Sequence, residues 1–102
     1  MTATRVCAAT DVPDGGSIRV KLPDGTPVAV FKVDGAFYAI GDTCSHEEAS
    51  LSDGELDELT VECPKHGAVF DLATGKNLTL PATKPVPSYA VRTEGNDVIL
   101  ES

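Results

Sequence analysis

Two short motifs, Cys44-Ser45-His46 and Cys63-Pro64-Lys65-His66, stand in the middle of the sequence with sixteen residues between them. Together they contain both histidines of the chain and two of its three cysteines. A soft sulfur ligand paired with an imidazole nitrogen is typical of zinc and of iron–sulfur centres. The pattern therefore predicts one metal centre whose ligands are Cys44, His46, Cys63 and His66.

The order of the donor types favours one kind of metal centre over the other. Structural zinc sites usually take their ligands as like pairs, Cys with Cys and His with His, a few residues apart. Each motif here carries one Cys and one His instead. A two-iron cluster in which one iron binds both cysteines and the other binds both histidines needs one ligand of each type from each loop. The residues favour such a mixed-ligand cluster, and a zinc site is the alternative.

With Gly67 following the second motif, these residues resemble the two ligand loops of Rieske [2Fe–2S] proteins. The short strands expected before the loops and the proline-rich segment after them also match, so the resemblance covers nearly the whole chain. It is strongest to the small Rieske-type ferredoxins of bacterial multicomponent oxygenases, especially aromatic-ring dioxygenase systems.

The resemblance implies an all-β fold, a Rieske-type antiparallel β-sandwich with a small cluster-binding subdomain, in a single domain over residues 1–102. The cluster-binding loops would lie at about 43–48 and 62–68, and a proline loop at 81–87 would border the cluster. The implied cofactor is one Rieske-type [2Fe–2S] cluster. Its implied ligands are Cys44, His46, Cys63 and His66, with the His-bound iron nearer the surface.

The sequence outside the motifs consists of short β-type runs separated by turn signals. Asp34-Gly35, between two apolar runs, predicts a tight hairpin. Residues 49–59 could hold a helical turn. Three prolines within residues 81–87 exclude a central strand there and predict either a rigid connection or a stiff flap. The runs expected to form strands are residues 4–8, 17–22, 28–33, 36–40, 60–62, 68–72, 89–93 and 98–101.

Charge and composition exclude several classes of partner. Eight basic against 16 acidic residues give a formal net charge of −8, which opposes binding to nucleic acid or to an anionic membrane surface. The apolar runs, such as residues 28–31, are far too short to span a membrane, and no signal peptide is evident, so a cytoplasmic protein is expected. The segment between the motifs contains no Lys or Arg and is either a docking face for a basic partner or a solvated loop. Its acidic residues are Glu47, Glu48, Asp53, Glu55, Asp57, Glu58 and Glu62.

The remaining residues predict an electron carrier rather than an enzyme. With both histidines used as ligands, none is left for an oxygen-activating iron site, and no G-x-G-x-x-G unit for NADH or flavin is present. The resemblance implies a flavin-dependent, NADH-dependent ferredoxin reductase as electron donor and a terminal non-haem iron oxygenase, with its own Rieske cluster, as acceptor. A monomer is expected. The alternatives are a small Rieske-fold subunit of assimilatory nitrite reductase and a zinc-stabilised interaction module.

Differences from the respiratory Rieske proteins predict a low reduction potential. Those proteins resemble this chain but carry an extra Cys in each loop and a Ser and a Tyr after the second His. Here the corresponding positions near the second loop hold Ala68 and Phe70, which have no hydroxyl to donate to the cluster or its ligand sulfur. Cys7 lies in the first β-type run and is expected to be a small buried residue without a redox role.

Overall fold

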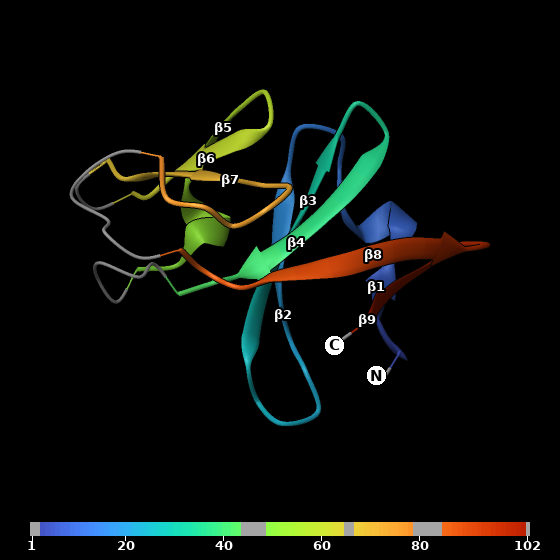
Figure 1. The fold of residues 1–102 in the computed structure, drawn as a ribbon. Helices are drawn as coiled ribbons and strands as arrows, with labels where there is room; N and C mark the ends of the chain where they lie inside the picture. The colour runs from blue at the N-terminus through green and yellow to red at the C-terminus, as the bar shows by residue number, and fades with distance from the viewer. Residues whose placement is uncertain (1–2, 44–48, 65–66, 79–84, 102) are drawn as a thin grey trace.

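The structure is a computed structural model, and it describes residues 3–43, 49–64, 67–78 and 85–101. Two antiparallel sheets make up most of this part of the chain (Figure 1). The larger sheet has the strand order β1-β9-β8-β4-β3-β2, and the smaller has the order β5-β6-β7. The strands are β1 (Ala3–Ala8), β2 (Ser17–Lys21), β3 (Pro27–Val33), β4 (Ala36–Gly41), β5 (Glu55–Asp57), β6 (Thr60–Glu62), β7 (Val69–Asp71), β8 (Ser88–Glu94) and β9 (Asp97–Glu101). The predicted all-β fold is confirmed.

The hairpin predicted at Asp34-Gly35 joins β3 to β4. Val33 pairs with Ala36, so the loop has two residues. Both loop residues have positive φ, 50° at Asp34 and 80° at Gly35, as a type I′ turn requires. This turn twists the two strands in the direction that an antiparallel sheet favours. The sequence therefore determines this part of the sheet locally.

The larger sheet is strongly curled. β4 pairs with β8 only through Ala39 with Tyr89 and Ile40 with Ser88, and the two strands then diverge (Figure 1). The strands at the two ends of the order, β1 and β2, also contact each other. The curl encloses a core that contains Val28, Val30 and Leu100.

The smaller sheet and a short 3-10 helix lie at the end of the molecule opposite the described ends of the chain (Figure 1). The helix, η2 (Leu51–Asp53), falls within residues 49–59, where the sequence allowed a helical turn. Strand β5 was not predicted, because Glu55-Leu56-Asp57 carries little strand signal of its own and is ordered by pairing with β6. A second 3-10 helix that was not predicted, η1 (Ala9–Asp11), follows β1.

One apolar cluster joins the two sheets. It combines Ala29, Phe31 and Ile40 of the larger sheet with Val61 and Phe70 of the smaller one, and all five are fully buried. Burying apolar surface on both sides fixes the smaller sheet against the larger one. In the described part of the chain, no helix has the length and apolar character needed to cross a membrane.

Candidate metal centre

Of the four predicted ligands, Cys63 lies within the described residues. Cys44, His46 and His66 lie outside them, so their placement is not described. The same holds for residues 81–84 of the predicted proline loop and for Glu47 and Glu48 of the acidic segment. The described part of the site consists of Cys63 and of residues at the bases of the two predicted loops.

Cys63 begins the turn between β6 and β7, where the second ligand loop was predicted. Its backbone N–H donates to the carbonyl oxygen of Ala68 at 2.7 Å, and the Gly67 N–H donates to the Cys63 carbonyl at 3.2 Å. Gly67 has a φ of 75°, a conformation that costs little only for glycine. The turn thus closes through its own backbone and leaves Cys63 with 2% of its surface exposed.

A cavity of about 300 Å³ opens beside Cys63. Cys63, Pro64 and Gly67 line one part of it, and Asp53, Glu55 and Glu62 line the rest. These three acidic side chains are exposed, as are Asp57 and Glu58 toward the turn of the β5–β6 hairpin. A buried sulfur donor therefore lies next to Asp53, Glu55 and Glu62, which we call the acidic rim.

The base of the first predicted loop lies close to this turn. Thr43 and Ser50, on either side of the segment that carries Cys44 and His46, form an antiparallel bridge. Just beyond them, Leu51 packs in the same buried cluster as Cys63 and Ala68. Gly54, which ends η2, lies so close to β6 that an added Cβ would come 2.2 Å from the Glu62 carbonyl oxygen. The two loop bases are therefore packed against each other.

The described end of the proline segment is anchored near the same cluster. The Val86 N–H donates to the Gly75 carbonyl at 2.9 Å, and the Gly41 N–H donates to the Pro87 carbonyl at 2.8 Å. Val86 is buried in the cluster that contains Cys63. Gly75 is required here, since its φ is 75° and an added Cβ would lie 2.1 Å from the Val86 carbonyl oxygen. These contacts fix the described end of the segment beside the buried cluster.

Cys7 lies away from the site. It is buried in the core inside the curl of the larger sheet, with Val98 and Leu100 as members of the same cluster. Burial, followed by the negative charge of Asp11, raises the pKa of the Cys7 thiol. The thiol is therefore neutral at ordinary pH, and the prediction that Cys7 is a buried apolar residue is confirmed.

Comparison with known proteins agrees with the resemblance in the motifs. The chain matches the Rieske [2Fe-2S] domain over residues 2–90. This chain belongs to the Rieske [2Fe-2S] domain family. Its cofactor is accordingly a Rieske-type [2Fe–2S] cluster, and the zinc alternative is not supported.

Two solved structures and one curated relative show which members of the Rieske family the chain is similar to. The 3-phenylpropionate/cinnamic acid dioxygenase ferredoxin subunit of Escherichia coli (strain K12) is 50% identical over 103 residues, with 99% of this chain and 94% of that protein covered. The Sphingomonas yanoikuyae B1 ferredoxin is 34% identical with a TM-score of 0.92 and 99% of both chains covered. A chain of the carbazole 1,9a-dioxygenase complex of reduced oxygenase and oxidized ferredoxin is 40% identical, with a TM-score of 0.88 and 96% and 91% covered.

The described residues fit a Rieske cluster. The buried Cys63 offers a sulfur donor at the wall of a cavity, and soft thiolate is the ligand that iron–sulfur centres use. The turn that holds it is closed by backbone hydrogen bonds and needs no bulky side chain at Gly67. The acidic rim disfavours the addition of an electron nearby, although solvent screening weakens this effect.

Sequence reasoning missed one part of the site. Asp42 directly follows β4, stands two positions before Cys44, and is buried with 2% of its surface exposed. Its partners are Ser50 and Ser52, which follow the first ligand loop, and Arg19, which lies on the distant strand β2. The one signal in the sequence was an acidic residue two positions before a predicted ligand, and this position alone does not predict that the residue is buried.

Proposed function

We propose that this chain is a one-electron carrier of a ring-hydroxylating dioxygenase system. It would accept electrons from an NADH-dependent flavin reductase and pass them to a terminal non-haem iron oxygenase, as a cytoplasmic monomer. The observation that carries this proposal is the 50% identity, over almost the whole chain, to a ferredoxin subunit of a dioxygenase. The likeness to a ferredoxin solved together with its oxygenase supports the choice of acceptor.

We further propose that Cys44 and Cys63 bind one iron and that His46 and His66 bind the other. The burial of Cys63 beside a cavity supports its part of this assignment. The three other ligands rest on the motifs and on the family. The cluster supplies a site that takes up and releases one electron. The protein's own contribution is to hold its sulfur ligand out of water and to leave one side of the site open to a partner.

The acidic rim supports the proposal that the partner docks on this chain through a basic surface. Asp53, Glu55 and Glu62 line the cavity beside Cys63 and are exposed, and the chain has a net charge of −8. Complementary charge accelerates association, and salt screens it. The rate of electron transfer to the oxygenase should therefore fall as the salt concentration rises. A rate that does not depend on salt would contradict this docking face and leave the carrier function intact.

The proposed function is tested with the purified holoprotein. We expect two iron ions and two acid-labile sulfides per chain, and the electron paramagnetic resonance (EPR) signal of a mixed-ligand cluster after dithionite reduction. With NADH, a flavin reductase and a ring-hydroxylating oxygenase of the phenylpropionate class, the chain should be required for product formation. Support of nitrite reduction instead would favour the nitrite reductase alternative.

The matched variants are Cys63→Ser and Cys7→Ser. Both replace a buried thiol, but only Cys63 lies at the proposed cluster. Cys63→Ser should lose most of its iron and its ability to support product formation, whereas Cys7→Ser should retain both. Equal iron content in the two variants would contradict the assignment of Cys63 as a ligand. Size-exclusion chromatography with light scattering tests the monomer.

A further inference from the structure

Asp42 is a buried carboxylate that the proposed electron transfer does not use. Within residues 3–43, 49–64, 67–78 and 85–101, it is the one charged side chain that is buried. Burying a charge is costly unless hydrogen bonds and ion pairs compensate for it. The partners of Asp42 therefore show what its burial contributes to the structure.

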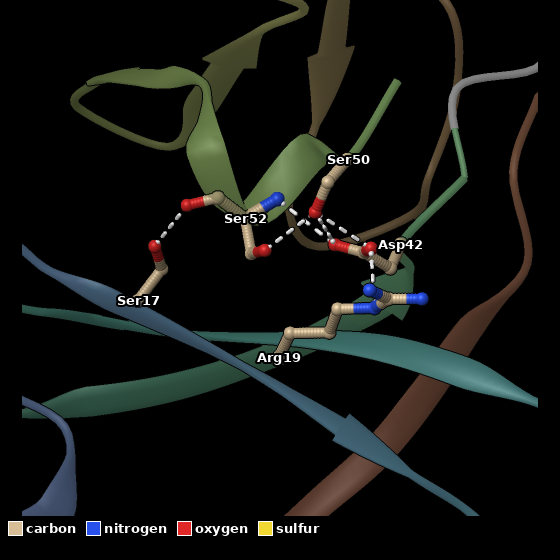
Figure 2. A network of polar contacts seen from close by, with 5 residues as sticks. All are labelled: Ser17, Arg19, Asp42, Ser50 and Ser52. Carbon is tan, nitrogen blue, oxygen red and sulfur yellow. Dashed lines mark hydrogen bonds and ion pairs between the residues drawn. The ribbon is translucent and has the colours of Figure 1, made fainter. Parts of the chain in front are cut away.

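The partners lie on two sides of the carboxylate, Ser50 and Ser52 at η2 and Arg19 on β2, as Figure 2 shows. The Ser50 hydroxyl lies 2.8 Å from Oδ1 and 2.7 Å from Oδ2 of Asp42, and donates to this carboxylate. The Ser52 backbone N–H donates to Oδ1 at 3.0 Å. Arg19, on β2, places its Nε 3.2 Å from Oδ2. Both carboxylate oxygens are thus engaged.

These contacts cap η2 from outside the helix. Ser50 is the N-cap residue, but its side chain makes no capping hydrogen bond because its hydroxyl is turned to Asp42. The Asp42 carboxylate instead accepts the Ser52 N–H, and the Asp42 carbonyl accepts the Leu51 N–H at 2.7 Å. Two N–H groups of the first turn, which a helix itself leaves without partners, are satisfied by one residue.

The same contacts close the base of the first ligand loop. Asp42 precedes Thr43, and its partners Ser50 and Ser52 follow the loop on the other side. The network also reaches β2, because Arg19 binds Asp42 and the Ser17 hydroxyl donates to the Ser52 carbonyl at 2.6 Å (Figure 2). The two ends of the loop are thereby fixed to each other and to the larger sheet.

We propose that Asp42 is a positioning residue for the cluster. Its carboxylate holds the two ends of segment 43–50 together, and the proposed ligands Cys44 and His46 lie between these ends in the sequence. This inference rests on the proposed ligand assignment. Fixing the ends of a loop in advance removes part of the entropy cost of bringing its ligands together. Losing the carboxylate should therefore let the ligands separate more often and release iron.

The test is the rate of iron release from the holoprotein to an excess of chelator, followed by the loss of visible absorbance. Asp42→Asn keeps the side-chain volume but removes the charge and one of the two acceptor oxygens. We expect release about 10- to 100-fold faster than from the wild type, because removing a residue that orients metal ligands usually lowers metal affinity by about that factor and lower affinity appears mainly as faster dissociation. The EPR g-values and the midpoint potential of the remaining cluster should also shift.

Two controls separate positioning from general stability. Asp97→Asn makes the same chemical change at an exposed ion pair with Arg5, away from the loops, and should release iron at the wild-type rate. Val98→Ala removes fully buried volume from the core inside the curl and lowers stability without touching the loop base. It should release iron more slowly than Asp42→Asn, with unchanged g-values.

Two outcomes overturn the inference. If Asp42→Asn releases iron at the wild-type rate, or no faster than Val98→Ala and with unchanged g-values, Asp42 does not position the ligands. That outcome leaves the proposed function standing. If the wild-type protein itself holds no Rieske cluster, the ligand assignment fails, and the inference fails with it.

Discussion

The two ligand loops are held at their bases by different kinds of interaction. The second loop is a hairpin turn that closes through backbone hydrogen bonds between Cys63, Gly67 and Ala68, all within six residues. The first loop is closed by a backbone bridge between Thr43 and Ser50 and, in addition, by the side chain of Asp42, which binds Ser50 and Arg19 of the distant strand β2. The second base is therefore local, whereas the first also depends on a tertiary contact. Substitutions at the first base should therefore also destabilise the larger sheet, whereas substitutions at the second base should destabilise only the hairpin.

The largest expected effect lies where the two bases meet, at Gly54. An added Cβ would lie 2.2 Å from the Glu62 carbonyl oxygen and 3.0 Å from Cγ2 of Val61, and the backbone of β6 cannot move aside cheaply. Gly54→Ala should therefore lower the free energy of unfolding by about 3 kcal/mol or more, at the upper end of overpacking effects. Urea denaturation measures the loss, and iron content should fall with it.

The control for Gly54→Ala is Gly35→Ala. Gly54 has an ordinary φ of −77°, so the stability lost in Gly54→Ala comes from the steric clash of the added Cβ. Gly35 has a φ of 80° with nothing within 4 Å of an added Cβ. Gly35→Ala should therefore lower the free energy of unfolding by about 1–2 kcal/mol, through backbone strain alone. If the two variants lose the same stability and retain the same iron, the bases of the loops are not tightly packed against each other.

The next effect concerns the local base. Gly67 has a φ of 75°, and an added Cβ would lie 3.4 Å from Oε1 of Glu62, an exposed and adaptable side chain. Gly67→Ala should cost about 1–2 kcal/mol through backbone strain alone. Hydrogen exchange should report faster opening at the Cys63 amide and unchanged protection at Leu51 and Ser52. Loss of protection at all three amides would show that the second base is not local.

Much of this arrangement could be predicted from the sequence where the signal is local. The turn at Asp34-Gly35 was found because two adjacent residues determine it. Strand β5 was missed because Glu55-Leu56-Asp57 carries little strand signal of its own, although its partner β6 follows after a two-residue turn. The contacts of Asp42 were missed because Arg19 is brought to it from a strand far away in the sequence. The ligand motifs could be recognised in the sequence for a different reason, because metal chemistry restricts the residue types that can serve as ligands.

A smaller effect is expected on the reduction potential at the second loop. Ala68 is fully buried beside Cys63, and its resemblance to a hydroxyl-bearing position in respiratory Rieske proteins suggests the variant Ala68→Ser. A hydroxyl that donates to sulfur stabilises the reduced cluster by about 1 kcal/mol more than the oxidised one, or about 40 mV for one electron. Protein film voltammetry should show this rise, and an unchanged potential would contradict it. Ser17→Ala, at the first base, should leave the potential unchanged.

The smallest expected effect is that of removing Arg19, the charged partner of Asp42, while its neutral partners Ser50 and Ser52 remain. Arg19 is 54% exposed, so solvent screens its ion pair with the buried carboxylate, and such pairs contribute about 0–1 kcal/mol. Arg19→Gln should therefore cost less than about 1 kcal/mol in urea denaturation, and the difference from wild type should vanish at high salt. The Ser50 hydroxyl and the Ser52 amide, both part-buried, would still satisfy the carboxylate. If Arg19→Gln instead releases iron as fast as Asp42→Asn, the ion pair between Arg19 and Asp42 is what holds the first base. The rate of iron release from the wild type should then rise with ionic strength and should not depend on the packing around η2.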